Sequence, residues 1–212
     1  MKPQRRDSWQ EAWQLSLDIT CADLRAADLA DRCAKSGATL SAADGAVEVT
    51  FLNRLYRVTP SDFDVALAGS ESAVSITDKI LILHYLSTAG GKAVTGEWMT
   101  FGEAPGGDQY LPVFRARSLD QLVRAFDGRE DDLTAAAEAM GGRPAEHGDV
   151  SVAIDVFPRV SVAATLWRAD DEFPASGGFL FDKCTPDYLP TEDMVVVASK
   201  VVGMLMRRGR AS

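Results

Sequence analysis

One short segment near the end of the chain concentrates the side chains that could carry chemistry. Residues 181–193 (FDKCTPDYLPTED) contain three aspartates, a glutamate, a thiol, a lysine and a tyrosine. The carboxylate oxygens of Asp182, Glu192 and Asp193 are of the type that a hard cation such as Mg²⁺ prefers, and paired carboxylates can also act as acid and base. One hypothesis is therefore a metal-dependent enzyme that uses these three carboxylates, in which Asp182→Asn removes metal binding with little loss of fold.

The same carboxylates also have a structural interpretation. Thr191 at the start of an apolar helix is typical of an N-cap, and acidic side chains in a first turn interact favourably with the helix dipole. Capping explains the presence of Glu192 and Asp193 without any ligand, so we favour it for them. Asp182 directly follows an apolar strand, where ligand-facing side chains often emerge, but it could equally accept backbone hydrogen bonds from the turn at Thr185-Pro186.

Cys184 is the thiol of this segment. It directly follows Lys183, whose positive charge could lower the pKa of the thiol and make it reactive. No histidine lies nearby in the sequence, so a Cys–His nucleophile or a Cys–His metal site would need His84 or His147 to arrive through the fold. His147 lies in a polar loop, where we expect it to be exposed.

A second group of candidates comes from a loop rich in glycine and aromatic residues at 96–110 and from the helix that carries His84. The aromatic side chains could line a flat apolar pocket, or they could pin the loop to the core. The pair Gly106-Gly107 lacks a phosphate-binding signature and favours a tight turn. His84 could be an axial ligand to haem or a corrinoid, or a general base, but a lone histidine on an apolar helix is more often a hydrogen-bonded core residue. If the two segments and His84 face one another, the cofactor-binding residues are His84, Trp98, Phe101, Tyr110, Asp182, Cys184 and Tyr188.

Composition narrows the class of protein. The chain has 212 residues, 46% of them hydrophobic, which is enough for a buried core. A formal net charge of −9 disfavours a nucleic-acid partner. No apolar run approaches the roughly 20 residues of a membrane span, and no secretory signal is recognisable. Three cysteines without a CxxC pair suit a reducing cytoplasm and do not complete an iron–sulfur ligand set.

The hydrophobic periodicity predicts an α+β fold. Helical spacing predicts helices over 7–34 with a break near 20–23, and over 75–89, 118–126, 130–140 and 191–208. Alternation predicts strands over 47–51, 55–58 and 150–157; a mostly apolar run predicts a strand over 160–167, and short strands are expected over 38–40 and 178–181. There is no regular βαβ alternation, so we expect a single domain over residues 1–212, with antiparallel hairpins packed against several helices and frayed ends at 1–6 and 208–212.

Four pieces of the sequence carry a family resemblance: residues 82–86 (ILHYL), 106–110 (GGDQY) with Phe114, 180–182 (LFD) and 188–193 (YLPTED). In their order and spacing the chain resembles the uncharacterised domain family 3786 of anaerobic bacteria and archaea. The resemblance implies an anaerobic host and a setting of redox or corrinoid metabolism. Some members carry a cysteine-rich iron–sulfur module that this chain lacks, so any cluster would belong to a partner. The resemblance supplies no catalytic residues.

Three functions follow from these observations. The first, which we favour, is a non-catalytic ligand- or cofactor-binding accessory protein in anaerobic redox or corrinoid metabolism, with an iron–sulfur or corrinoid protein as partner. The second is the metal-dependent carboxylate enzyme. The third is an acidic scaffold for protein interaction. The sequence does not identify the ligand.

Overall fold

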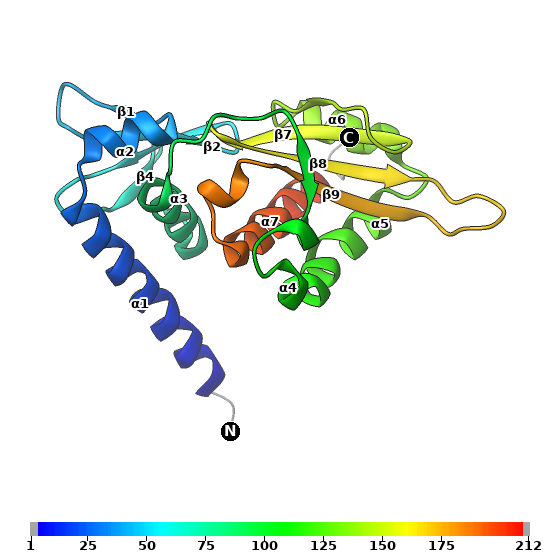
Figure 1. The fold of residues 1–212 in the computed structure, drawn as a ribbon, viewed down its shortest axis with the longest axis horizontal. Coiled ribbons are helices and arrows are strands. Elements are labelled where there is room, and N and C mark those ends of the chain that lie inside the picture. Colours follow the sequence, from blue (N-terminus) through cyan, green and yellow to red (C-terminus); the bar gives the residue numbers. More distant parts are fainter. Residues whose placement is uncertain (1–3, 210–212) are drawn as a thin grey trace. The chain divides into compact units, whose positions relative to one another are not determined.

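The protein has an α+β fold in which all strand pairing is antiparallel (Figure 1), and the fold class expected from the sequence is confirmed. The structure, a computed structural model, describes residues 4–209, and describes side chains from Glu11 onward. The chain divides into two compact units, Met1–Lys92 and Ala93–Ser212. The predicted single domain over 1–212 stays a prediction. Of the ends expected to fray, 1–3 and 210–212 lie outside the described residues.

The first unit combines three helices with a small sheet. The helices are α1 (Gln4–Ala26), α2 (Leu29–Ser36) and α3 (Ile76–Thr88). The strands are β1 (Thr39–Leu40), β2 (Val47–Phe51), β3 (Arg54–Val58) and β4 (Val65–Leu67), and they pair in chain order. α1 packs along α3, while α2 contacts both α3 and β1. Sequence reasoning missed β4, whose three residues become a strand by pairing with β3.

The first two helices separate later than the sequence suggested. We expected a break near 20–23, but α1 continues through it, because the hydroxyl of Thr20 donates to the backbone carbonyl of Ser16 and so stays within the helix. The break comes at Asp28, whose carboxylate accepts the backbone N–H of Ala30 and caps α2. The sequence also predicts a capping box formed by Ser8 and Glu11 at the start of the first helix, but the side chain of Ser8 lies outside the described residues.

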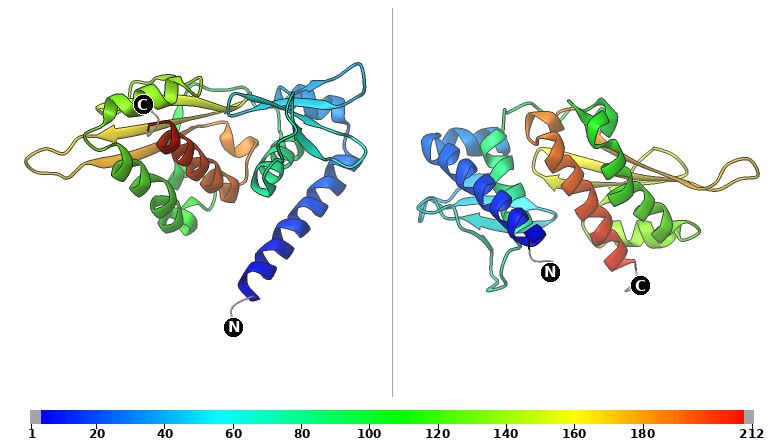
Figure 2. Two further views of the ribbon diagram at one scale, coloured as in Figure 1. Left: turned by 180° about the vertical axis from the view of Figure 1, so that it is seen from behind. Right: turned by 90° about the horizontal axis from the view of Figure 1, so that it is seen from below.

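The second unit has a five-stranded sheet with helices against it. Its strands are β5 (Trp98–Thr100), β6 (Arg143–Pro144), β7 (Val150–Phe157), β8 (Val160–Trp167) and β9 (Ser176–Asp182), in the order β5-β9-β8-β7-β6. Its α-helices are α4 (Gly107–Phe114), α5 (Asp120–Phe126), α6 (Glu130–Glu138) and α7 (Thr191–Arg208). Short helical turns cover Phe101–Glu103 and Thr185–Asp187. α4, α5 and α7 lie together on one face of the sheet (Figure 2).

The region expected to be a long loop is more regular than predicted. Within 96–110 the chain forms β5, because Trp98 to Thr100 pair with the end of β9, and it then enters α4 at Gly107. A π-helical segment, Arg115–Leu119, joins α4 to α5, so the helix expected to begin at Ser118 begins eleven residues earlier. In this segment the hydroxyl of Ser118 donates to the carbonyl of Phe114. No helix in the described residues is long and apolar enough to cross a membrane.

Gly107 lies at a close approach between α4 and the turn before it. A Cβ atom added there would stand 2.2 Å from the carbonyl oxygen of Phe101. Phe101 itself is buried and stacks on Phe114, with ring centroids 4.1 Å apart, so neither side of the contact can move without disturbing the core. The preceding Gly106 has φ +71°, which favours glycine. The glycine pair therefore builds a tight turn.

We expect Gly107→Ala to destabilise the protein by about 1–3 kcal/mol, because the new methyl group overpacks a backbone contact in the core. Gly102→Ala is the matched control, since a Cβ atom there meets only a side-chain oxygen of Asp108 at 3.7 Å. Thermal unfolding of both variants checks this. Equal melting temperatures for the two variants would contradict it.

Candidate functional site

Asp182, the leading metal-ligand candidate, is a buried structural residue. Its side-chain carboxylate accepts the backbone N–H of Gly96 at 2.8 Å and that of Cys184 at 2.9 Å. It also accepts the hydroxyl of Thr95 at 2.8 Å and the backbone N–H of Thr95 at 3.2 Å. These donors fix the segment before β5 onto the end of β9. The predicted donors from Thr185-Pro186 do not appear among its hydrogen bonds.

The electrostatics of Asp182 follow from these contacts. Burial alone would raise the pKa of the carboxyl group, but hydrogen bonds donated by Cys184 and Thr95 outweigh it and lower the pKa below the ordinary value. Among residues 11–209, whose side chains the structure describes, no group of three or more His, Cys, Asp or Glu side chains could hold a metal ion. The metal hypothesis therefore gains no support from the surroundings of Asp182.

Cys184 is not the reactive thiol that its neighbour suggested. Burial, followed by the adjacent Asp182 carboxylate, raises the pKa of the Cys184 thiol to about 12. The thiol donates to the carbonyl of Arg159 at 3.2 Å. The charge of Lys183 is instead directed to Glu97, with which it forms an ion pair at 2.8 Å. The hypothesis that Lys183 activates Cys184 is wrong for this geometry, because a thiol with so high a pKa stays protonated.

The start of α7 is fastened to the glycine turn rather than capped as predicted. Pro190 occupies the N-cap position, and Thr191, one residue later, donates its hydroxyl to the carbonyl of Pro105 at 2.6 Å. Tyr110 donates to the carboxylate of Glu192, and this bond lowers the pKa of Glu192. Asp193 is buried in the first turn of the same helix. The structure thus brings the two predicted segments together, through contacts that hold the fold.

The remaining candidates are spread through both units. Tyr188 is fully buried, as is Phe101. Trp98 is half-buried and meets the ring of His147 edge-on, at 5.9 Å between centroids, so His147 is less exposed than we expected. His84 belongs to the first unit, where its Nε2 atom and the hydroxyl of Ser16 are hydrogen-bonded at 3.0 Å. That bond agrees with the interpretation of His84 as a hydrogen-bonded structural residue, and it links α3 to α1.

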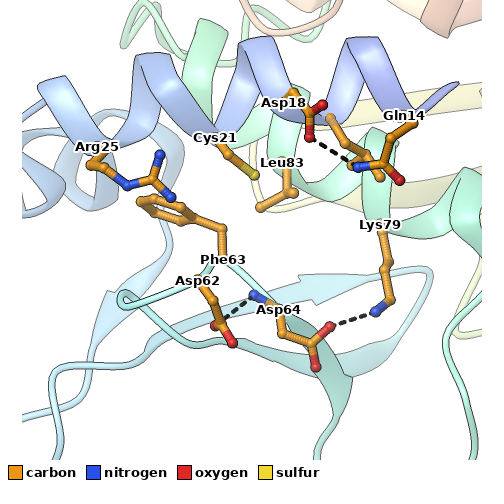
Figure 3. Close-up of a pocket in the computed structure, with 10 residues that line it drawn as sticks. Gln14, Asp18, Cys21, Arg25, Asp62, Phe63, Asp64, Lys79 and Leu83 are labelled. Atoms are coloured by element: carbon orange, nitrogen blue, oxygen red, sulfur yellow. Dashed lines mark hydrogen bonds and ion pairs between the residues drawn. The ribbon is translucent and has the colours of Figure 1, made fainter. Parts of the chain in front are cut away.

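A pocket that sequence reasoning missed lies in the first unit (Figure 3). It has a volume of about 500 Å³ and is bounded by α1, by the turn between β3 and β4, and by α3. Its lining residues are Gln14, Leu17, Asp18, Cys21, Arg25, Asp62, Phe63, Asp64, Lys79 and Leu83. This volume is within the range of about 300–1,000 Å³ that is usual for small-molecule sites.

One wall of the pocket is a polar stripe on α1. Gln14, Asp18, Cys21 and Arg25 follow one another at spacings of four, three and four residues, which places them on one face of the helix. The amide of Gln14 donates to the carboxylate of Asp18 at 2.9 Å. The opposite wall is the turn 62–64, with Lys79 and Leu83 of α3 beside it (Figure 3).

The turn that forms the opposite wall is held in an uncommon conformation. Phe63 has φ +57°, in the left-handed region that bulky residues rarely adopt, and its side chain is buried. Two hydrogen bonds hold the turn: the N–H of Phe63 donates to the carbonyl of Thr59 at 2.8 Å, and that of Asp64 to the carboxylate of Asp62 at 3.1 Å. The guanidinium carbon of Arg25 lies 5.5 Å from the centre of the Phe63 ring. Strained residues of this kind concentrate at ligand-binding segments.

The pocket contains one internal ion pair and three further charges. Lys79 pairs with Asp64, and this contact lowers the pKa of the Asp64 carboxyl group. Within the described residues, no ion pair is formed by Arg25, Asp18 or Asp62. Burial raises the pKa of the half-buried Cys21 thiol; the charge of Arg25 lowers it, while those of Asp18 and Asp62 raise it. The Cys21 thiol is therefore within electrostatic range of all three charges.

Comparison with known proteins gives a family and no function. A family model described as a domain of unknown function (DUF3786) matches residues 28–204. The chain belongs to this family. No curated protein and no solved structure matches the chain.

The DUF3786 match includes only one wall of the pocket. Asp62 to Asp64, Lys79 and Leu83 lie within the matched residues, whereas the stripe on α1 precedes Asp28, where the match begins. A signal for the stripe was present in the sequence, because polar residues interrupt an apolar helical pattern at regular spacing on one face. The opposite wall, the turn 62–64, begins 37 residues after Arg25, and no pattern in its own sequence indicates a pocket.

We expect Asp182→Asn to destabilise the protein by about 2–3 kcal/mol, because an amide nitrogen would be placed among N–H and O–H donors that now bond to a buried carboxylate. Glu97→Gln is the control: it removes one partner of an exposed ion pair, which is worth about 1 kcal/mol or less. Urea unfolding of both variants measures the difference.

The acid dependence of stability provides a second readout for Asp182. A carboxyl group whose folded-state pKa is lowered stabilises the protein above its unfolded pKa, and that contribution is lost as the pH falls through the folded value. The wild type should therefore lose stability below about pH 4, and Asp182→Asn should lose less. Parallel acid curves for the two proteins would contradict this role.

Proposed function

We propose that this protein is a non-catalytic binding protein for a small polar metabolite, and that the ligand occupies the pocket between α1, the turn 62–64 and α3. The single observation that carries the proposal is that one pocket of about 500 Å³ is lined by three charged side chains, Arg25, Asp18 and Asp62, which form no ion pair with any described residue. A small number of polar or charged groups is the usual means by which a pocket fixes the orientation of a polar ligand.

The use of the other reactive groups supports binding over catalysis. The carboxylate of Asp182 is engaged by Thr95, Gly96 and Cys184, and the pKa of Cys184 keeps that thiol protonated. His84 is hydrogen-bonded to Ser16 through Nε2. Each group that suggested an acid, a base or a nucleophile thus has a role in the fold. The carboxylate enzyme and the acidic scaffold have no observation of this kind in their favour.

A pocket-blocking variant tests the site. Cys21→Phe should abolish ligand binding, because the ring would occupy the cavity between α1 and the turn 62–64. Ala22→Phe adds the same ring to the next residue of α1, which is exposed and does not line the pocket, and it should leave binding unchanged. Native mass spectrometry after incubation with a metabolite extract, with melting curves to confirm folding, makes the comparison. Ligand retention by folded Cys21→Phe would refute the proposed site.

We extend the proposal to the setting that the family resemblance implies. The host would be an anaerobe, the location cytoplasmic, and the pathway one of redox or corrinoid metabolism with an iron–sulfur or corrinoid protein as partner. This setting rests on the family resemblance alone.

An anaerobic ultraviolet–visible spectrum of the protein purified from its host, with metal analysis, tests the cofactor part of this setting. The pocket proposal expects a colourless protein, because its site is built for a polar metabolite. A Soret or corrinoid band would instead revive His84 as an axial ligand, and its loss in His84→Ala would confirm that role.

A further inference from the structure

The chemical class of the ligand can be inferred from the charges in the pocket, and this step rests on the proposed function. Among the described residues that line the pocket, Arg25 is a cation without an ion pair, and Asp18 and Asp62 are carboxylates without one. Lys79 and Asp64 neutralise each other. A ligand that balances the remaining charges carries one anionic and two cationic groups.

The positions of the three charges further restrict the ligand. Asp18 and Arg25 are seven residues apart on α1, a rise of about 10 Å along the helix. Asp62 is adjacent to Phe63, whose ring lies under the guanidinium of Arg25. Asp62 thus lies on the turn below Arg25 and Phe63, Asp18 is two helical turns along α1 from Arg25, and the Cys21 thiol lies between Arg25 and Asp18 (Figure 3).

We propose that the pocket binds an amino-acid-like molecule with a second amino group, a diamino monocarboxylic acid. Its carboxylate faces Arg25, its α-ammonium group faces Asp62, and its distal ammonium group faces Asp18. The guanidinium of Arg25 has donors suited to a carboxylate, and its contact with Phe63 holds it in place. The apolar side chains of Leu17 and Leu83 also line the pocket, and they would contact the methylene chain between the charged ends of the ligand.

Alternative ligands fit less of the pocket. A phosphate or a dicarboxylate would pair with Arg25 but would bring negative charge toward Asp18 and Asp62, and like charges at this range repel. A simple diamine would satisfy the two carboxylates and leave Arg25 unpaired. An uncharged metabolite would form no ion pair with any of the three residues. Only a ligand with both signs of charge, separated by a chain, engages all three residues.

Isothermal titration calorimetry on the full-length protein tests the assignment with L-lysine and three analogues, each of which lacks one of its charged groups. The probes are L-lysine, norleucine, which lacks the distal ammonium group, cadaverine, which lacks the carboxylate, and 6-aminohexanoate, which lacks the α-ammonium group. We expect L-lysine to bind at least about tenfold more tightly than each of the other three, since loss of one charge-assisted pair costs 1.4 kcal/mol or more.

Charge variants assign each end of the ligand. Arg25→Gln should abolish the preference for L-lysine over cadaverine and keep the preference over norleucine, whereas Asp18→Asn should do the reverse. Asp23→Asn, on an exposed part of α1 outside the pocket lining, is the control and should bind all four probes as the wild type does. Melting curves show whether each variant folds, and the wild-type comparison of the four probes needs no variant.

The two levels of the proposal fail differently. If the four probes bind equally or not at all while Cys21→Phe still loses a ligand captured from the extract, the diamino acid assignment is overturned and the pocket remains a binding site. If the wild type captures no ligand that Cys21→Phe lacks and binds none of the probes, the proposed function fails as well.

Discussion

The second unit depends on one buried carboxylate. Asp182 at the end of β9 accepts hydrogen bonds from the backbone of Gly96 and Cys184 and from both donors of Thr95, and the residue that follows it, Lys183, pairs with Glu97. A buried carboxylate is tolerated only when its oxygens are satisfied, so the chain around it must keep this geometry. The short strand β5 can add to the sheet because this contact holds the residues before it. The contact thus gives several of the polar groups in this segment a role in the fold.

Much of the fold could be predicted from the sequence where a local pattern was sufficient. Alternation over 150–157 and the mostly apolar run over 160–167, with Pro158-Arg159 between them, located β7 and β8 to the residue. The long apolar run after Pro190 located α7. Each of these elements can be identified from its own sequence, because the local pattern of apolar residues is sufficient to predict it.

Where a distant part of the chain decides the outcome, the same reasoning failed. Three residues form β5 only because β9 lies beside them, and Thr20 failed to end α1 because its hydroxyl bonded within the helix. The role of Asp182 was open because its partner Thr95 is 87 residues away. The pocket was missed for the same reason: a polar stripe on α1 is ordinary on a surface helix, and it becomes a wall only when the turn 62–64 lies opposite.

The two walls of the pocket differ in how freely they can change. Phe63 has a strained backbone conformation, and Lys79 forms an ion pair with Asp64. A substitution on that side therefore disturbs the turn as well as the cavity. The α1 side is a row of side chains on a helix that precedes the matched region, and helical geometry tolerates most residues at those positions. In the proposed binding site, exchange of that row alone would change which molecule the cavity accepts and leave every residue from 28 onward unchanged. Under that proposal the first helix is a replaceable selectivity element on an otherwise fixed scaffold.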